Sequence, residues 1–273
     1  MNQPAGSAAP AAARTIEAIG HEEPLTSWLR PGVAFPDWSV VASVSARAAL
    51  VAMLEAVWDR RAWQDYTPAE DGTRRTILEL YLHLGRAPSP EEIACHADIS
   101  SHQVHVLLKR LAARDLIVIE GGKITGAYPL TDRPSEHRVV IADRELRAMC
   151  AIDALGVGVM YRTDATIKSR CRLCRAPIDI TAGDAGRCLA VVSPPAAVGF
   201  AGTGYWGNCA ATSLCTSVAF FCGGAHLSAW RSSQSLALPG FRLSIDEALQ
   251  VGRAIFGPVL APSALEIHPE TSS

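Results

Sequence analysis

An uncharged segment from Cys188 to Trp230 constrains the fold of this chain more than any other feature, because it holds no Asp, Glu, Lys or Arg. It is longer than the roughly 20 apolar residues that span a bilayer. However, it also contains Pro194, Pro195, Asn208 and several glycines, a composition that does not suit a lipid-facing helix. We therefore predict a buried region of strands and loops that forms a dry pocket, with no membrane span.

The rest of the composition indicates a globular protein that works in a reducing compartment. Hydrophobic residues make up 49% of the 273 residues, enough for one large domain or two small ones. The formal net charge of −2 gives no general attraction to nucleic acid or to an acidic membrane. The N-terminus has no cationic start followed by an apolar core, so we expect no signal peptide, a cytoplasmic location and reduced thiols.

The chain divides into four predicted parts. Residues 1–40 are expected to form a flexible N-terminal extension, of which residues 26–40 could pack on the body as an irregular arm. Residues 41–133 are expected to form a helical, winged-helix-like domain. Residues 134–262 should form a second domain, and 263–273 a C-terminal tail.

The winged-helix prediction rests on the order of three helices and a hairpin. Helices are expected over 73–84, 90–97 and 101–114, after an N-terminal helix over 41–61, and Ser89-Pro90-Glu91-Glu92 is a helix start. A strand, Gly121-Gly122 and a second strand follow. Between residues 73 and 131, seven basic residues oppose six acidic ones, a poor footprint for phosphate binding. A structural role therefore competes with DNA binding, and we expect no nucleic acid partner.

The second part mixes strands and helices on an irregular plan, which indicates an α+β fold with a mixed or antiparallel sheet. Strands are expected over 137–142, 163–170, 177–180, 188–192 and 211–221. Helices are expected over 143–160, 226–232 and 244–256, the last of them capped by Ser244.

Two cysteines and one aspartate in this part could carry chemistry. Residues three apart on a helix share a face, so a helix over 143–160 would place Cys150 beside Asp153. Cys215 lies on the predicted strand 211–221, facing away from Cys222. Taken alone, each of the two cysteines is also compatible with a small core residue, and Asp153 with a surface carboxylate.

The pair Cys171–Cys174 is the one CxxC motif of the chain. Such a pair can supply half of a tetrahedral zinc site or a redox disulfide, but no second CxxC completes a zinc site and the motif lies between two strands. The sequence leaves open whether Cys171, Cys174, Cys209 or Cys222 bind metal. No HExxH, GxSxG or phosphate-binding loop is present.

The segment 149–155, Met-Cys-Ala-Ile-Asp-Ala-Leu, resembles the active-site helix of the bacterial organomercurial (alkylmercury) lyases, in which an aspartate also follows a cysteine by three residues. The segment 162–171 resembles that family's strand ending in a cysteine. Ser213-Leu214-Cys215 resembles the segment with the second catalytic cysteine. Met149 and Cys222 differ from the residues usual in the family. The resemblance implies catalytic roles for Cys150, Asp153 and Cys215, a catalytic domain at 134–262 and a winged-helix-like part without a DNA role.

The chemistry of these residues agrees with that resemblance. Mercury(II) is soft and thiolate is the softest side-chain ligand, so two cysteines on one mercury weaken its bond to carbon. An uncharged surrounding favours the protonated form of Asp153, which could donate a proton to the departing carbon. We expect a hydrocarbon and Hg(II) as products, with mercury bound by Cys150, Cys215 and Asp153. No organic cofactor is expected, and low-molecular-weight thiols or a mercuric reductase would remove the ion.

Two alternatives remain at this point. One is a winged-helix DNA-binding regulator that responds to soft metals, for which a basic recognition helix would be the discriminating feature. The other is a related lyase that acts on another organometallic substrate, which Cys222 and the altered pocket lining favour.

Overall fold

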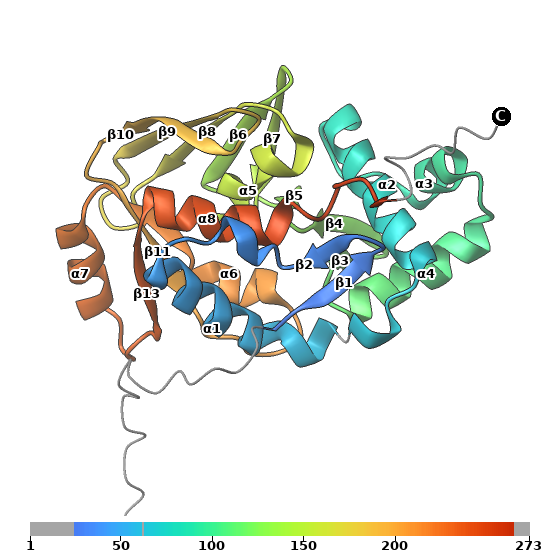
Figure 1. Ribbon diagram of the computed structural model, residues 1–273, viewed down its shortest axis with the longest axis horizontal. Helices are drawn as coiled ribbons and strands as arrows, with labels where there is room; N and C mark the ends of the chain where they lie inside the picture. Colours follow the sequence, from blue (N-terminus) through green and yellow to red (C-terminus); the bar gives the residue numbers. More distant parts are fainter. Residues whose placement is uncertain (1–24, 62, 265–273) are drawn as a thin grey trace, which may run out of the picture.

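The computed structural model of the protein describes residues 25–61 and 63–264. It confirms an α+β architecture, in which helices surround an eight-stranded sheet and a three-stranded sheet, both antiparallel. Figure 1 shows α2, α3 and α4 at one end of the molecule and α7 at the other, with α8 across the middle. Residues 1–24 of the expected extension and 265–273 of the expected tail lie outside the described residues.

The described residues before α1 are folded against the body. Strands β1 (Ser27–Arg30) and β2 (Val33–Phe35) form a hairpin, followed by a 3-10 helix at Trp38–Val40. Phe35 is fully buried against the ring of Trp63, at 4.8 Å between centroids, and Arg30 pairs with Asp71 at 2.8 Å. This packing agrees with an arm over 26–40 and differs from a flexible extension that reaches residue 40.

Four helices and a hairpin follow in the predicted order. The helices are α1 (Val44–Arg61), α2 (Pro68–Leu84), α3 (Pro90–Ala97) and α4 (Ser101–Ala113), and the hairpin strands are β3 (Ile117–Glu120) and β4 (Lys123–Ala127). Thr67, Ser89 and Ser100 begin α2, α3 and α4, each with a capping box that satisfies free backbone N–H groups. The helix start predicted at Ser89 is therefore confirmed.

The large sheet runs across the boundary expected at residue 133. Its strand order is β10-β9-β8-β6-β7-β5-β4-β3, so the hairpin of the helical part extends the sheet of the following part. The remaining strands are β5 (Leu130–Thr131), β6 (His137–Ile141), β7 (Arg144–Ala148), β8 (Ala165–Arg170), β9 (Pro177–Gly183) and β10 (Cys188–Ser193). The connection is the pairing of Leu130 in β5 with Ala148 in β7.

The single helix predicted over 143–160 is wrong in its first half. That stretch begins with strand β7, and helix α5 (Ala151–Tyr161) starts only after it. Ala142 and Asp143 both have positive φ, 47° and 59°, which turns β6 directly into β7 as a tight hairpin. Pairing with β6 therefore overrides the helical composition of the segment.

The last part of the chain forms the small sheet and the helices α6, α7 and α8. The small sheet consists of β11 (Val198–Gly202), β12 (Ala219–Phe221) and β13 (Gly240–Ser244), in the order β12-β11-β13. The continuous strand predicted over 211–221 is wrong, because the short helix α6 (Leu214–Ser217) precedes β12. Helix α7 (Gly224–Ser232) and the closing helix α8 (Ile245–Phe256) follow, and Ser244 caps α8 as predicted.

The uncharged segment 188–230 is only partly buried. Strand β11 is buried along its whole length, and so are Cys215 and β12. In contrast, β10 is an edge strand of the large sheet, with Val191 53% exposed, and Trp206 is 55% exposed. Among the described residues, no helix combines the length and the apolar character that a membrane span requires.

Candidate active site

The structure brings Cys150, Asp153 and Cys215 together inside the protein. Their ligand atoms all lie within 4.8 Å of one another. The three side chains are 1%, 5% and 5% exposed, respectively. Sequence reasoning therefore identified a true cluster, although two of its three members lie on different elements from those predicted.

Cys150 is the N-cap of α5 rather than a residue inside a helix. Its backbone is extended, and its sulfur accepts a hydrogen bond from the backbone N–H of Asp153 at 3.4 Å. Asp153 occupies the first turn of the same helix. The three-residue spacing thus brings thiol and carboxyl together through helix capping.

Cys215 reaches the same point from the short helix α6. Its Sγ lies 3.8 Å from Oδ2 of Asp153, the distance of a weak thiol-to-carboxylate hydrogen bond. The backbone N–H of Ala151 donates to the carbonyl of Val218 at 3.4 Å, which joins the start of α5 to the end of α6. Thiols from two segments far apart in sequence therefore face one carboxylate.

Both thiols are held in their protonated form. Burial raises the pKa of Cys150, even though the helix N-terminus and a hydrogen bond with Cys215 act in the opposite direction. The pKa of Cys215 is raised well above the ordinary value of 9.0 by its hydrogen bond with Cys150, then by burial and by the nearby acidic groups Asp153 and Asp115. A soft metal that binds here must therefore displace protons from the thiols.

A buried carboxylate that sequence reasoning missed anchors the loop leading to Cys215. Asp115 is 3% exposed and accepts hydrogen bonds from the hydroxyls of Tyr128 and Tyr205, at 3.0 and 3.2 Å. It also accepts from the backbone N–H of Ala210 at 2.8 Å. No motif marks this aspartate, since its partners lie as far as 95 residues away.

The other cysteines lie in different surroundings. Cys171 and Cys174 form a second cluster with Cys222 and His226. The sequence signal for this second cluster is Cys222-Gly-Gly-Ala-His226, in which a cysteine and a histidine are four residues apart. Cys209 is half-buried near the hydroxyl of Tyr128, and Cys95 and Cys188 are exposed.

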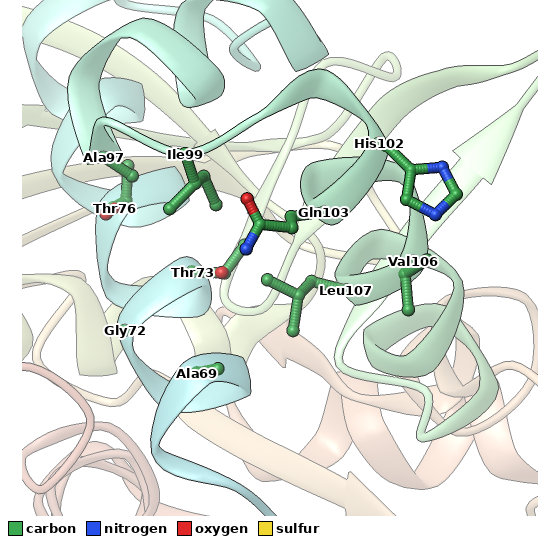
Figure 2. Close-up of a pocket in the computed structure, with 10 residues that line it drawn as sticks. All are labelled: Ala69, Gly72, Thr73, Thr76, Ala97, Ile99, His102, Gln103, Val106 and Leu107. Carbon is green, nitrogen blue, oxygen red and sulfur yellow. The ribbon is translucent and has the colours of Figure 1, made fainter.

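A separate pocket lies in the helical part, away from these clusters. Figure 2 shows it between α2 and α4, lined by Thr73, Thr76, Ile99, Gln103 and Leu107 among others. Its lining contains no cysteine and no carboxylate. Apart from the imidazole of His102, the lining offers no metal ligand, and it offers no thiolate to a soft metal.

Comparisons with known proteins relate both the sequence and the fold to one family. Residues 130–257 match the family described as alkylmercury lyase, MerB. The solved structure of the mercury-bound form of MerB2 is similar to this chain, with a TM-score of 0.63 and 23% identity, covering 80% of this chain and 100% of that one. At this identity the structural likeness shows a shared fold. No curated protein matches the chain.

Proposed function

We propose that this chain is an organomercurial lyase that uses Cys150, Asp153 and Cys215 for protonolysis, and the match of residues 130–257 to the alkylmercury lyase family supports this proposal. The observation that carries the proposal is the buried cluster of these two thiols and one carboxylate, with all ligand atoms within 4.8 Å. The likeness to MerB2, whose structure was solved in its mercury-bound form, supports the fold on which this proposal rests.

Binding of the substrate begins with loss of thiol protons. An organomercurial R–Hg⁺ enters with an external thiolate as its other ligand, and the sulfurs of Cys150 and Cys215 replace that thiolate. The Cys215 thiol, which lies 3.8 Å from Asp153, transfers its proton to that carboxylate. The other thiol proton leaves with the displaced thiolate.

Cleavage then requires a proton at carbon. Two thiolates on mercury raise the electron density on the metal and weaken its bond to carbon. The protonated Asp153 gives its proton to that carbon, which keeps the electron pair of the broken bond and leaves as R–H. Asp153 returns to the carboxylate form, and Hg(II) stays bound to both sulfurs until low-molecular-weight thiols or a mercuric reductase remove it.

The test is anaerobic incubation of the reduced protein with phenylmercury and excess glutathione, with benzene measured by headspace gas chromatography. We expect benzene from the native chain and none above background from Cys150→Ser or Cys215→Ser. Cys95→Ser is the matched control, since this exposed cysteine belongs to neither cluster, and it should retain full activity. A folded, fully reduced native protein that forms no benzene from phenylmercury, and no methane when methylmercury replaces it, would refute the proposal and favour a metal-responsive regulator or a lyase for another organometallic substrate.

A further inference from the structure

A second group of soft ligands lies outside the proposed catalytic cluster. Cys171 and Cys174 stand in the turn between β8 and β9, whereas Cys222 directly follows β12 and His226 lies in the first turns of α7. The four ligand atoms are all within 4.8 Å of one another. We propose that these residues form a tetrahedral Cys₃His zinc site with a structural role, an inference that goes beyond the lyase activity.

The distances within the group agree with a tetrahedron. Bonds of about 2.3 Å to sulfur and about 2.0 Å to nitrogen give sulfur–sulfur edges of about 3.8 Å and sulfur–nitrogen edges of about 3.5 Å. The Sγ atoms of Cys174 and Cys222 are 3.8 Å apart, and Sγ of Cys171 is 3.6 Å from Nδ1 of His226. The Cys222–His226 distance is 3.1 Å and would lengthen by about 0.4 Å on metal binding.

The turn that carries two of the ligands has a fixed shape. The backbone N–H of Cys171 donates to the carbonyl of Ala176 at 2.8 Å, and that of Arg175 donates to the carbonyl of Cys171 at 2.9 Å. These hydrogen bonds hold the turn in place, so little rearrangement is needed for the metal to bind.

The donor set selects zinc among the common metals. Three thiolates and one imidazole in tetrahedral array are a closed structural zinc set, with no open position for substrate. A disulfide between Cys174 and Cys222 would need a sulfur–sulfur distance of about 2.05 Å, far below the observed 3.8 Å. The proposed zinc site shares no residue with the three that are proposed for catalysis.

The site would join the two sheets next to Cys215. Cys171 and Cys174 lie in the turn between two strands of the large sheet, whereas Cys222 directly follows β12 of the small sheet and His226 lies in α7. Between the first two ligands, Arg172 donates from its backbone N–H to Phe220 and from Nη1 to the carbonyl of Thr216, both at 3.0 Å. Thr216 follows Cys215, so a metal that fixes this turn also supports the backbone of a proposed catalytic residue.

The test is metal analysis of the reduced, full-length protein produced with zinc in the medium. We expect about one zinc per chain by mass spectrometry, and after exchange with Co(II) an intense absorption between roughly 600 and 750 nm, which reports tetrahedral thiolate ligation. Cys174→Ser and His226→Ala should lose most of the zinc or weaken and shift the Co(II) band. The exposed-cysteine control Cys188→Ser, and the double variant Cys150→Ser/Cys215→Ser, should retain both signals.

Two results would overturn the proposal. The first is a folded native protein, with all thiols reduced, that holds no zinc and gives no tetrahedral spectrum when Co(II) is titrated in. The second is zinc that persists in both cluster variants but is lost from the Cys150→Ser/Cys215→Ser variant, which would place the metal at the other site. No organomercurial is used, so failure here is distinguishable from failure of the lyase proposal.

Discussion

At the scale of single residues, opposing effects decide the resting state of the proposed catalytic thiols. A helix N-terminus stabilises a thiolate at Cys150 by about 0.3–1 kcal/mol, or up to ~2 kcal/mol where partly buried. Burial acts the other way and dominates, so the pKa of Cys150 is raised. In the proposed reaction the two thiols therefore keep their protons until mercury, which competes with protons for sulfur, displaces them.

The role proposed for Asp153 predicts that binding and cleavage can be separated. In Asp153→Asn both thiols remain, so the variant should still capture the R–Hg group, while hydrocarbon release falls by about 10²–10⁴-fold for want of a proton donor. Intact-protein mass spectrometry should show the variant carrying phenylmercury after it has been mixed with one equivalent. The control is Asp179→Asn, an exposed aspartate on β9. Rapid benzene release from Asp153→Asn would contradict the proton-donor role.

Asp115 is predicted to act as a positioning residue for the segment that carries Cys215. An amide in Asp115→Asn would direct an N–H group at one of three donors, at a local cost of about 1–3 kcal/mol. The substitution would also remove a negative charge that helps to raise the pKa of Cys215. This effect on the pKa is smaller than those of Cys150 and of burial. We expect a higher KM for phenylmercury and a pH–rate profile displaced to lower pH. An unchanged profile with only a lower melting temperature would indicate a purely structural role.

At the scale of secondary-structure elements, the site depends on the close approach of α5 and α8. A Cβ atom on Gly156 would lie 2.2 Å from the ring of Phe256, so Gly156→Ala should destabilise the protein by about 1–3 kcal/mol through overpacking. On the exposed face of α2, a Cβ at Gly72 meets nothing within 4 Å. Gly72→Ala should therefore stabilise by up to about 1 kcal/mol. Urea unfolding measures the change in the free energy of unfolding for each variant. Equal changes in the two variants would refute the packing argument.

The elements also show which parts of the fold the sequence could predict. The capping residues Ser89 and Ser244 could be predicted because a cap depends on residues within one turn. The β6–β7 hairpin was missed because its turn, Ala142-Asp143, lacks glycine, and the strand is specified by a partner in the sheet. Helix α6 was missed because four residues give no periodic signal.

At the scale of the whole molecule, the packing of two sheets against each other determines which residues meet. The sequence predicted the three members of the proposed catalytic cluster through local spacing and family resemblance. It could not predict the Cys₃His cluster or the partners of Asp115, because both join segments that are far apart in the chain. The order of the strands, and not any single motif, brings these side chains together.

The junction between the sheets contains a buried histidine that should make global stability depend on pH. His137 on β6 is 2% exposed, its Nδ1 lies 2.9 Å from the hydroxyl of Ser169, and its ring makes a T-shaped contact with the ring of Phe220 on β12. Burial, and then the positive charges of Arg172 and Arg175, lower the pKa of His137 from 6.5 to about 3. This histidine is therefore neutral in the folded protein at every pH near neutrality.

In the unfolded chain His137 takes up a proton below pH ~6.5, whereas in the folded protein it does so only near pH 3. The free energy of unfolding should therefore fall as the pH drops through this window. Within this window the free energy of unfolding should change by at most about 1.4 kcal/mol per pH unit. Urea unfolding at pH 6 and pH 5, above the range of most carboxylates, should show a loss of about 1 kcal/mol for the native chain. His137→Gln should be less stable but lose much less between the two pH values, while the exposed-histidine control His105→Gln should behave like the native chain. Equal losses in the native chain and in His137→Gln would show that another group carries the acid sensitivity, and that the junction between the sheets does not depend on a neutral imidazole.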